Sequence, residues 1–495
     1  LAYMVTDDNT EYKGKYFVLT NDITLNDDVI NDAGTGLKYA ESSYKLWTPI
    51  GEYGITYDDD FMGYFDGQGH TIRGMVCIDN EGQRDYNGLF GSVDEATIKN
   101  LNLEDCYLFA KEVDSDSYRY GTLIGNSWNS RFINCHVSKS VVDVTFIPYN
   151  RNDVFVGGMI GCCDFAQGRN KLMFTAKTHM ANCSFKGNIY VKSIQVAQHS
   201  YMHAGGLIGY QLPKSDVKLY LADCYTEGEI YMTSTETLSY LYLGGILSEF
   251  TIGETEIKNC VNRMNITVDT NHGLYDCYIS GLGYTKNKLT NDKFKVSQCV
   301  SFGTIKIGDN AQKVKIIRLF LNGLLGNIIY NDEGVNLSNC AFYGKFDIHC
   351  RGDYALITSL CDRLVENNSP SVVYSVGNVI DINYDETDLD KVCFKAYSLD
   401  EDDDLIESKH HCYYHFANTG NVTFPCNGTA DASKYNKTLA EMKTDDFIKT
   451  LNTAAGSNMW GKLTGMSDAS LNGLPMPVAC GGVLSDYTGD GMSEN

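Results

Sequence analysis

The sequence has little proline, little tryptophan and few basic residues. Of its 495 residues, 7 are proline and 3 are tryptophan, and 40 Lys and Arg stand against 63 Asp and Glu, for a formal net charge of −23. This negative charge excludes nucleic-acid binding by phosphate neutralisation and docking on an anionic membrane. There is no apolar run of about 18 residues, so the sequence predicts no membrane-spanning helix. The zinc-protease motif H-E-x-x-H is also missing.

Glycine, tyrosine and cysteine are abundant instead, with 47, 34 and 17 copies. Hydrophobic residues make up 43% of the chain, which is enough for an extensive core and excludes bulk disorder. A chain of 495 residues is nevertheless too long for one ordinary compact domain. A long, glycine-rich chain of this kind is typical of proteins built from internal repeats.

Two short patterns alternate along the chain. One is an apolar string bracketed by glycine, found at Asn87–Gly91, Gly121–Gly125, Gly157–Gly161, Gly205–Gly209, Gly244–Ser248, Ser280–Tyr284 and Asn322–Gly326, and more weakly at Tyr354–Thr358. The other is a segment centred on Cys106, Cys135, Cys183, Cys224, Cys260, Cys299 or Cys340, at intervals of 29, 48, 41, 36, 39 and 41 residues. Such periodic alternation predicts a solenoid.

The residues around each cysteine predict which way the side chains point. Every second residue from Cys183 to Val191 is apolar or glycine, whereas Lys186, Asn188 and Tyr190 occupy the other parity. Because alternate residues of a strand face opposite sides, the cysteines should point inward and form one internal column of seven thiols. A short polar residue precedes most of them, namely Asn134, Asn182, Asp223, Asn259 and Asn339. Such residues tolerate left-handed backbone, so this position predicts a corner.

The predicted fold class is all-β, a right-handed single-stranded parallel β-helix of about eight coils with a small mixed α/β C-terminal cap. Residues 1–86 form an N-terminal β cap and first coil, residues 87–382 form the repeats, and residues 383–495 form an irregular acidic segment and a capping subdomain. Thr438 and Glu441 predict a helix N-terminus.

The repeats and both ends resemble bacterial surface proteins with GLUG-motif repeats, which occur in adhesin-like proteins of anaerobic gut bacteria and beside some IgA-directed peptidases. Gly205–Gly209 matches the motif, and the flanks match at Tyr16–Leu25, Trp47–Gly51, Phe61–Met75 and Cys412–Gly420. The resemblance implies a non-enzymatic adhesin at the outer surface of a bacterium or outside the cell. Its ligand would be a host or dietary glycan or protein, bound through outward faces and loops. Leu1 is not an initiator Met, so we expect a mature chain without its signal or anchor segment.

Outward-facing tyrosines are the predicted ligand-binding residues. Tyr190, Tyr225, Tyr231 and Tyr343 lie on the solvent parity of their strands. Their flat amphipathic rings suit contacts with sugars or proteins. The alternative is that tyrosine simply favours β surfaces.

Charged residues on the outward-facing parity of the strands are compatible with two further interpretations. The position three residues past each cysteine holds Ser138, Lys186, Glu227, Arg263, Phe302 and Tyr343. Its central charges form either a cross-strand charge ladder or the acid/base cluster of a carbohydrate-active enzyme, a polysaccharide lyase or glycoside hydrolase. A third alternative is a passive spacer that binds nothing.

No metal, cofactor or catalytic residue is predicted. His410, His411, Cys412 and His415 lack the paired spacing of a structural zinc site, and Asp58–Asp60 and Asp400–Asp404 do not follow the calcium-loop pattern. The expected state is a monomer.

Overall fold

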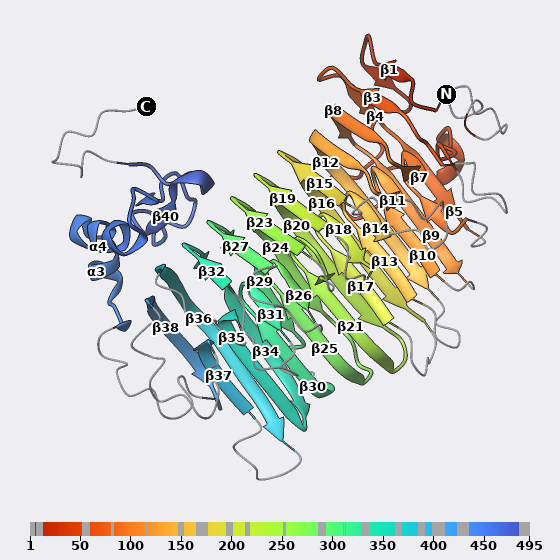
Figure 1. Cartoon of the computed structure of the whole chain (residues 1–495). Helices are drawn as coiled ribbons and strands as arrows, with labels where there is room; N and C mark the ends of the chain where they lie inside the picture. The colour runs from red at the N-terminus through yellow and green to blue at the C-terminus, as the bar shows by residue number, and fades with distance from the viewer. Residues whose placement is uncertain are drawn as a thin grey trace.

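The chain forms a parallel β-helix in a computed structural model (Figure 1). The structure describes residue 5 and residues 13–51, 60–80, 84–113, 117–146, 153–164, 177–194, 201–212, 218–250, 254–285, 294–309, 311, 313–327, 336–361, 369–384, 392–397, 411–422 and 435–484. Every ladder between the strands of the described coils is parallel, as a solenoid requires.

One side of the solenoid is a long curved sheet, here called the long sheet. Its N-terminal strands are β1 (Tyr16–Val18), β2 (Ile23–Thr24), β3 (Tyr64–Asp66), β4 (Thr71–Arg73), β5 (Val76–Asp79), β8 (Thr97–Glu104) and β9 (Tyr107–Val113). Next come β12 (Arg131–Phe146), β15 (Lys177–Ala181), β16 (Ser184–Ser193), β19 (Lys218–Ala222), β20 (Tyr225–Ser234), β23 (Glu254–Lys258) and β24 (Val261–Val268). The last are β27 (Phe294–Ser297), β28 (Val300–Ser301), β29 (Thr304–Ile307), β32 (Asn336–Ser338), β33 (Ala341–Phe342), β34 (Lys345–Gly352), β36 (Ser371–Tyr384) and β38 (Cys412–Gly420).

The opposite side consists of two shorter rows of strands. The first row is β6 (Tyr86–Asn87), β10 (Ser117–Gly121), β13 (Asp153–Gly157), β17 (Tyr201–Gly205), β21 (Leu238–Gly244), β25 (Leu274–Ser280), β30 (Val314–Asn322), β35 (Tyr354–Cys361) and β37 (Val392–Tyr397). The second is β7 (Phe90–Asp94), β11 (Ile124–Trp128), β14 (Ile160–Asp164), β18 (Ile208–Gln211), β22 (Glu249–Phe250), β26 (Gly283–Thr285) and β31 (Leu325–Asn327). The glycine strings make the sharp turns between the rows. A Cβ at Gly157 would lie 1.9 Å from the Ile160 carbonyl oxygen, so a side chain does not fit there.

The predicted corner is confirmed. Backbone φ angles at Asn134, Asn182, Asp223, Asn259 and Asn339 lie between 51° and 56°, and Gln298 has the same conformation at 52°. The amides also bond along the stack: Asn182 donates to Asn134 at 2.9 Å, and Asn134 donates to Asn100 at 3.0 Å. These bonds add side-chain cohesion to the backbone ladder.

The predicted cysteine column is correct for six of its seven members. Cys135, Cys183, Cys224, Cys260, Cys299 and Cys340 are all at most 1% exposed and line one inner column. Cys106 is also buried, but its place in that column was wrong, because Leu101 is the residue opposite Cys135. The Cys106 backbone amide instead donates a hydrogen bond to Ser140 Oγ on the next coil at 3.3 Å.

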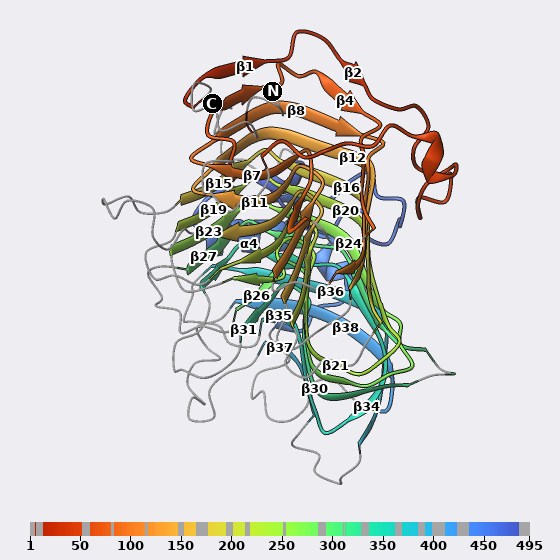
Figure 2. The ribbon, with the colours of Figure 1, turned by 90° about the vertical axis from the view of Figure 1, so that its right-hand side faces the viewer.

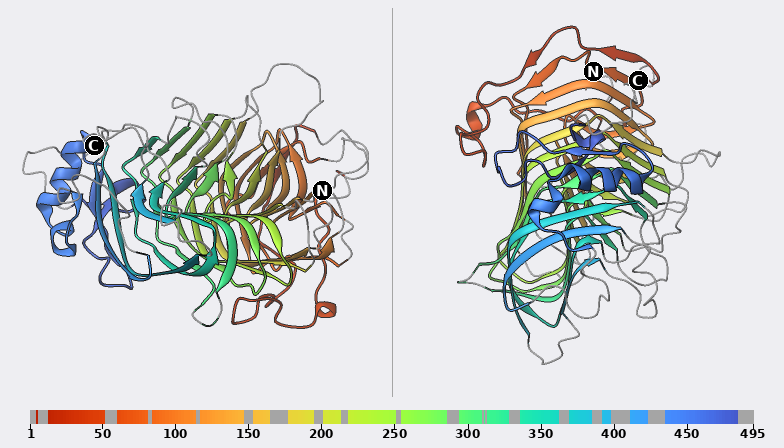
Figure 3. Two further views of the ribbon diagram at one scale, coloured as in Figure 1. Left: turned by 90° about the horizontal axis from the view of Figure 1, so that it is seen from below. Right: turned by 90° about the vertical axis from the view of Figure 1, so that its left-hand side faces the viewer.

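Two added elements cover parts of the outer face of the long sheet (Figure 2). An N-terminal flap, residues 26–47 with the 3-10 turn η2 (Glu41–Ser43), places Val29 and Ile30 against Val76, Tyr107 and Val141. A C-terminal subdomain, residues 435–484, covers the other end (Figure 3).

The C-terminal subdomain consists of α3 (Leu439–Met442), α4 (Asp445–Ala455), an antiparallel hairpin of β39 (Trp460–Lys462) and β40 (Pro475–Pro477), and η5 (Val478–Cys480). The predicted capping box of Thr438 and Glu441 is present at the start of α3. Trp460 Nε1 donates to Asn339 Oδ1 at 3.1 Å and joins the subdomain to the corner column.

The parallel stack continues past the expected boundary at residue 382, because β37 pairs with β35 and β38 pairs with β36. Within the part of the chain that the structure describes, no helix has the length and apolar character needed to cross a membrane.

Candidate ligand-binding groove

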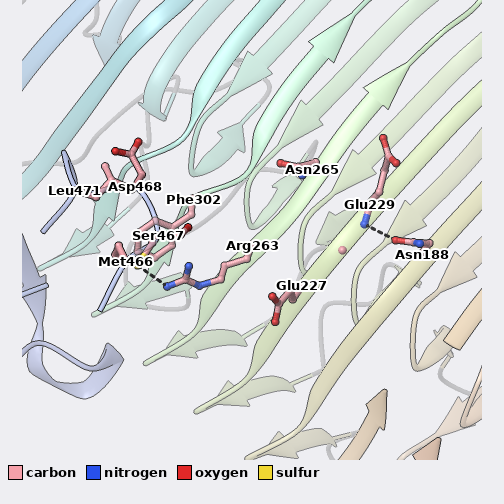
Figure 4. Close-up of a pocket in the computed structure, with 11 residues that line it drawn as sticks. Asn188, Glu227, Glu229, Arg263, Asn265, Phe302, Met466, Ser467, Asp468 and Leu471 are labelled. Atoms are coloured by element: carbon pink, nitrogen blue, oxygen red, sulfur yellow. Dashed lines mark hydrogen bonds between the residues drawn. The ribbon is translucent and has the colours of Figure 1, made fainter. Parts of the chain in front are cut away.

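A cavity of about 600 Å³ lies on the outer face of the long sheet, beside the C-terminal subdomain (Figure 4). Strands β16, β20, β24 and the β28–β29 segment form its floor, and the loop after β39 forms its wall. We call it the groove, lined by Asn188, Glu227, Gly228, Glu229, Arg263, Asn265, Phe302, Met466, Ser467, Asp468 and Leu471.

The charged row predicted from the cysteine spacing is present in register. Ser138 pairs with Lys186, Lys186 with Glu227, and Glu227 with Arg263 on successive coils. Lys186 Nζ lies 3.6 Å from Glu227 Oε2, and Tyr225 donates its hydroxyl proton to the same oxygen at 2.8 Å. Lys186 also lies over the Tyr225 ring, 5.1 Å from its centre. The first half of the row is therefore a paired cross-strand ladder.

Arg263 is held differently from Lys186. Its guanidinium group stacks over the Phe302 ring at 4.2 Å and donates from Nη2 to the sulfur of Met466 at 3.3 Å. Among the described residues, no carboxylate oxygen lies within 4.0 Å of this guanidinium, and the neighbouring Glu227 is paired with Lys186 instead. Stacking thus fixes the plane of the group while most of its donors stay available.

Polar groups next to Arg263 are fixed by the sheet. Asn188 Oδ1 accepts from the Glu229 amide at 3.1 Å, and Thr267 Oγ1 donates to Glu229 Oε1 at 2.8 Å. Asn188 Nδ2 also donates to the Gly34 carbonyl at 2.8 Å, which connects the groove floor to the N-terminal flap. These bonds hold amide and carboxylate groups in one orientation.

Gly228 brings two coils together beneath these groups. Its φ is 132°, and a Cβ there would lie 1.8 Å from the Gly187 carbonyl oxygen. A larger residue would push the strands apart, so glycine keeps the floor flat at this point.

Three of the predicted tyrosines lie on this face, beside the groove. Tyr190, Tyr225 and Tyr231 are half-buried, and the rings of Tyr190 and Tyr231 are 6.1 Å apart. The Tyr231 hydroxyl donates to Asp269 Oδ2 at 2.5 Å, and burial together with this carboxylate raises the pKa of Tyr231 to about 12. None of the three lines the cavity itself, and their ligand-binding role stays a prediction.

Tyr343 is placed differently, and its predicted exposure was wrong. It points out of the coil as expected, but it is only 5% exposed and packs in the core of the C-terminal subdomain. Its hydroxyl donates to the Pro475 carbonyl oxygen. The parity was correct, and a subdomain more than 90 residues further along the chain covers the side chain.

The histidine-rich segment does not assemble a metal site in the described residues. His410 lies outside them, Cys412 is buried, and His415 Nδ1 is 2.7 Å from the Lys437 carbonyl oxygen. Of the described chain, no group of three or more His, Cys, Asp or Glu is placed to hold a metal ion. Residues 58–59 and 400–404 of the acidic stretches also lie outside the described part.

The wall of the groove was not predicted from the sequence. Met466, Ser467, Asp468 and Leu471 come from a loop without periodicity or a recognisable motif, so no local signal marks them. The Ser470 amide donates to Asp468 at 2.9 Å, and hydrogen bonds from Ser470 hold the pKa of Asp468 below its usual value. That carboxylate therefore stays ionised at the rim.

Comparison with known proteins adds one distant likeness. No family model matches the chain, and no curated protein matches it. Among solved structures, the chain is similar to a crystal structure from Bacteroides ovatus described as a "putative immunoglobulin A1 protease", with 16% identity over 62% of this chain and 72% of that chain and a TM-score of 0.31. The resemblance to GLUG-motif proteins has no matching family model and stays a prediction.

Proposed function

We propose that the protein is a non-enzymatic glycan-binding protein of a bacterial surface, which holds a carbohydrate chain in the groove. The observation that carries this proposal is a cavity of about 600 Å³ lined by amides, carboxylates, a guanidinium group and an aromatic ring on a rigid sheet. Sugars present hydroxyl groups that both donate and accept, beside flat apolar patches of C–H groups. Planar polar side chains next to aromatic rings suit both features.

The scaffold supports binding at low entropic cost. Asn188 and Glu229 are fixed by hydrogen bonds between coils, and Arg263 is fixed by its stack on Phe302. Side chains that are already ordered lose little freedom when a ligand arrives. The sheet also extends beyond the cavity toward Tyr231, whose ring lies 6.1 Å from that of Tyr190 at the edge of the flap, so a chain of several sugars has further surface to follow.

The resemblance to GLUG-motif proteins is what supports a surface location. A stack of parallel coils is a stiff support, suitable for presenting a binding face away from a cell. We infer an extracellular or outer-surface protein that contacts a host or dietary glycan.

A carbohydrate-active enzyme is the second candidate. It is favoured by one observation, the presence of Glu227, Glu229 and Asp468 with Arg263 in a single cavity. A general acid must hold a proton near neutral pH, and enzymes achieve this by burying it away from positive charge. The Glu227 side chain is 49% exposed and lies beside Lys186, which suits a ladder better than catalysis.

The test is a glycan array followed by a product assay on every glycan that binds. We expect binding without turnover. Asn265 is exposed at the groove, and its Oδ1 accepts from the Thr304 amide at 3.0 Å. Asn265→Ala should weaken binding several-fold by removing hydrogen bonds to sugar, and thermal unfolding checks that loss of the Thr304 contact leaves the variant folded. Lys306→Ala, on the same face but outside the cavity, is the matched control and should bind as the wild type does.

Turnover of a bound glycan would replace the binding proposal with the enzyme. Binding that survives Asn265→Ala unchanged would place the glycan elsewhere on the molecule. If no glycan binds, the proposed function is wrong and the passive spacer gains.

A further inference from the structure

The row of charges across the groove contains more cations than carboxylates, and the cation without a close carboxylate is a candidate to bind a ligand. Glu227 lies between two cations, Lys186 on one coil and Arg263 on the next. It pairs with Lys186 at 3.6 Å and accepts from Tyr225 at 2.8 Å. Both contacts use Glu227 Oε2, and within the described part of the chain Arg263 is the cation of the row without a carboxylate oxygen within 4.0 Å.

The surroundings of Arg263 keep it available. The Arg263 guanidinium contacts the face of the Phe302 ring and the thioether sulfur of Met466, which is a weak acceptor. A guanidinium group carries five N–H donors in a planar fork that matches a carboxylate through two parallel hydrogen bonds. Of the described residues that line the groove, Arg263 is the one with a positive charge.

We propose that the groove recognises a glycan carrying an acidic sugar, whose carboxylate is bound by Arg263. This inference rests on the proposed glycan-binding function and names the substrate class. Arg263 takes the carboxylate, while Asn188, Glu229 and Asn265 are placed to bond hydroxyl groups of the same or neighbouring sugars.

The other charges limit the ligand to isolated acidic sugars. Glu227 is compensated by Lys186, but Glu229 and Asp468 still bring two negative charges to the groove against the one positive charge of Arg263, and the whole chain carries −23. A polyanion would place several carboxylates against this negative field and be repelled. A mainly neutral glycan with a single acidic residue avoids that repulsion.

The experiment uses pairs of oligosaccharides that differ in one group. In each pair, one oligosaccharide ends in an acidic sugar, which is glucuronate, galacturonate or sialate. The other ends in the same sugar with its carboxyl group reduced to an alcohol. Affinities are measured for the wild type and for Arg263→Gln, Arg263→Lys and Lys306→Gln. Lys306 lies on the outer face of β29, next to Thr267 of β24, and does not line the groove. Lys306→Gln therefore controls for the simple loss of one positive charge.

The wild type should bind at least one acidic glycan about tenfold to a hundredfold more tightly than its reduced partner. Arg263→Gln should abolish this difference, Arg263→Lys should restore part of it, and Lys306→Gln should keep it. A polyuronate should bind more weakly than the singly acidic glycan. Thermal unfolding of each variant confirms that it is folded, and the reduced glycans test the contact on the unaltered protein.

Two outcomes overturn the inference and differ from each other. If the wild type binds neutral glycans as well as acidic ones, or if Arg263→Gln still discriminates, the acidic-sugar assignment is wrong and glycan binding stands. If no member of any pair binds, the proposed function has failed and this inference fails with it.

Discussion

The inner thiol column and the outer charged row lie three residues apart on the same coils, yet they differ in kind. Inside, the six positions from Cys135 to Cys340 hold one residue type, all buried. Outside, the same coils carry Ser138, Lys186, Glu227, Arg263, Phe302 and Tyr343, which pass from polar through charged to aromatic. Each inner residue within the column has cysteine on both neighbouring coils, and the column ends at Leu101 beside Cys135, whereas each outer residue meets solvent, a partner or an added subdomain.

This difference shows which positions of a coil must repeat along the solenoid and which can differ from coil to coil. Identical inner residues give every coil the same cross-section, so coils can stack without adjustment. The outer row is not required to repeat, and its variation produces a paired end, an unpaired arginine and an apolar end under the C-terminal subdomain. Repetition therefore specifies the fold, and departures from it form the groove.

Alkaline pH should attack the inner column most strongly. Burial raises the pKa of the column thiols Cys260 and Cys299 well above the usual value of 9.0. Burial also raises the pKa of four buried thiols outside the column, Cys106, Cys163, Cys350 and Cys412, to about 12. Below pH 9 both states keep the protons and the stability is complete. Above pH 9 the unfolded chain loses protons that the folded chain keeps, so unfolding becomes easier by about 1.4 kcal/mol per pH unit for each such thiol.

Circular dichroism between pH 8 and 12 should therefore show cooperative unfolding in the alkaline half of this range. A thiol reagent at pH 8 should react slowly with the native protein and rapidly with the unfolded protein. Fast reaction of most thiols in the native state would contradict the buried column.

Substitutions at two neighbouring residues, one on the inner face and one on the outer face, should have very different effects on stability. Phe185 is fully buried, so Phe185→Ala should reduce the free energy of unfolding by about 3–5 kcal/mol through a cavity. Lys186 follows it in sequence with its side chain 53% exposed, and Lys186→Ala should change stability by about 0.5 kcal/mol or less. Denaturant unfolding followed by far-UV circular dichroism measures both. Equal effects would show that the faces do not differ as described.

The apolar end of the outer row should behave like the interior. Tyr343→Phe leaves the buried Pro475 carbonyl without its hydroxyl donor and should cost about 1–3 kcal/mol. The loss should appear as faster hydrogen exchange in α4 and β39. Tyr231→Phe removes a hydrogen bond at the exposed end of the face and is the matched control, expected to cost about 0.5 kcal/mol or less. If both variants exchange alike, the subdomain is not anchored at Tyr343.

The smallest effect should come from the paired half of the row. Glu227→Gln removes the ion pair with Lys186, whose partners are each about half exposed, and should change the free energy of unfolding by about 0.5 kcal/mol or less. The change should shrink further at high salt, because solvent-exposed pairs are screened. A cost above about 2 kcal/mol would mean that this pair is a structural element rather than a surface ladder.

The sequence predicted what depends on local pattern. Strand parity placed the thiols inside and Lys186, Glu227 and Arg263 outside, in the correct register, and short polar residues marked the corner. The prediction for Cys106 was wrong because it aligned the coils on cysteine alone, although the interval of 29 residues from Cys106 to Cys135 is shorter than the other intervals. Asn100 before Leu101, which has the left-handed conformation of Asn134, was the local signal for the true register.

The sequence did not predict what depends on chain segments that return from far away. Tyr343 has the same parity as Tyr225, and nothing near it indicates that Pro475 and Trp460 lie above it. The groove has the same origin, since its floor comes from residues 188–302 and its wall from residues 466–471. The groove exists because the non-repeating loop at residues 466–471 packs against the sheet at this place.

The C-terminal subdomain has a consequence for how the solenoid unravels. Its apolar core includes Val300, Ala341, Val372 and Tyr413, which belong to four successive coils. In a simple repeat array each coil is coupled only to its neighbours, and the ends fray one coil at a time. A brace that touches four coils at once adds longer-range coupling, so this end should open as a single block. The groove sits at the edge of that block, and so its wall and part of its floor should be lost together.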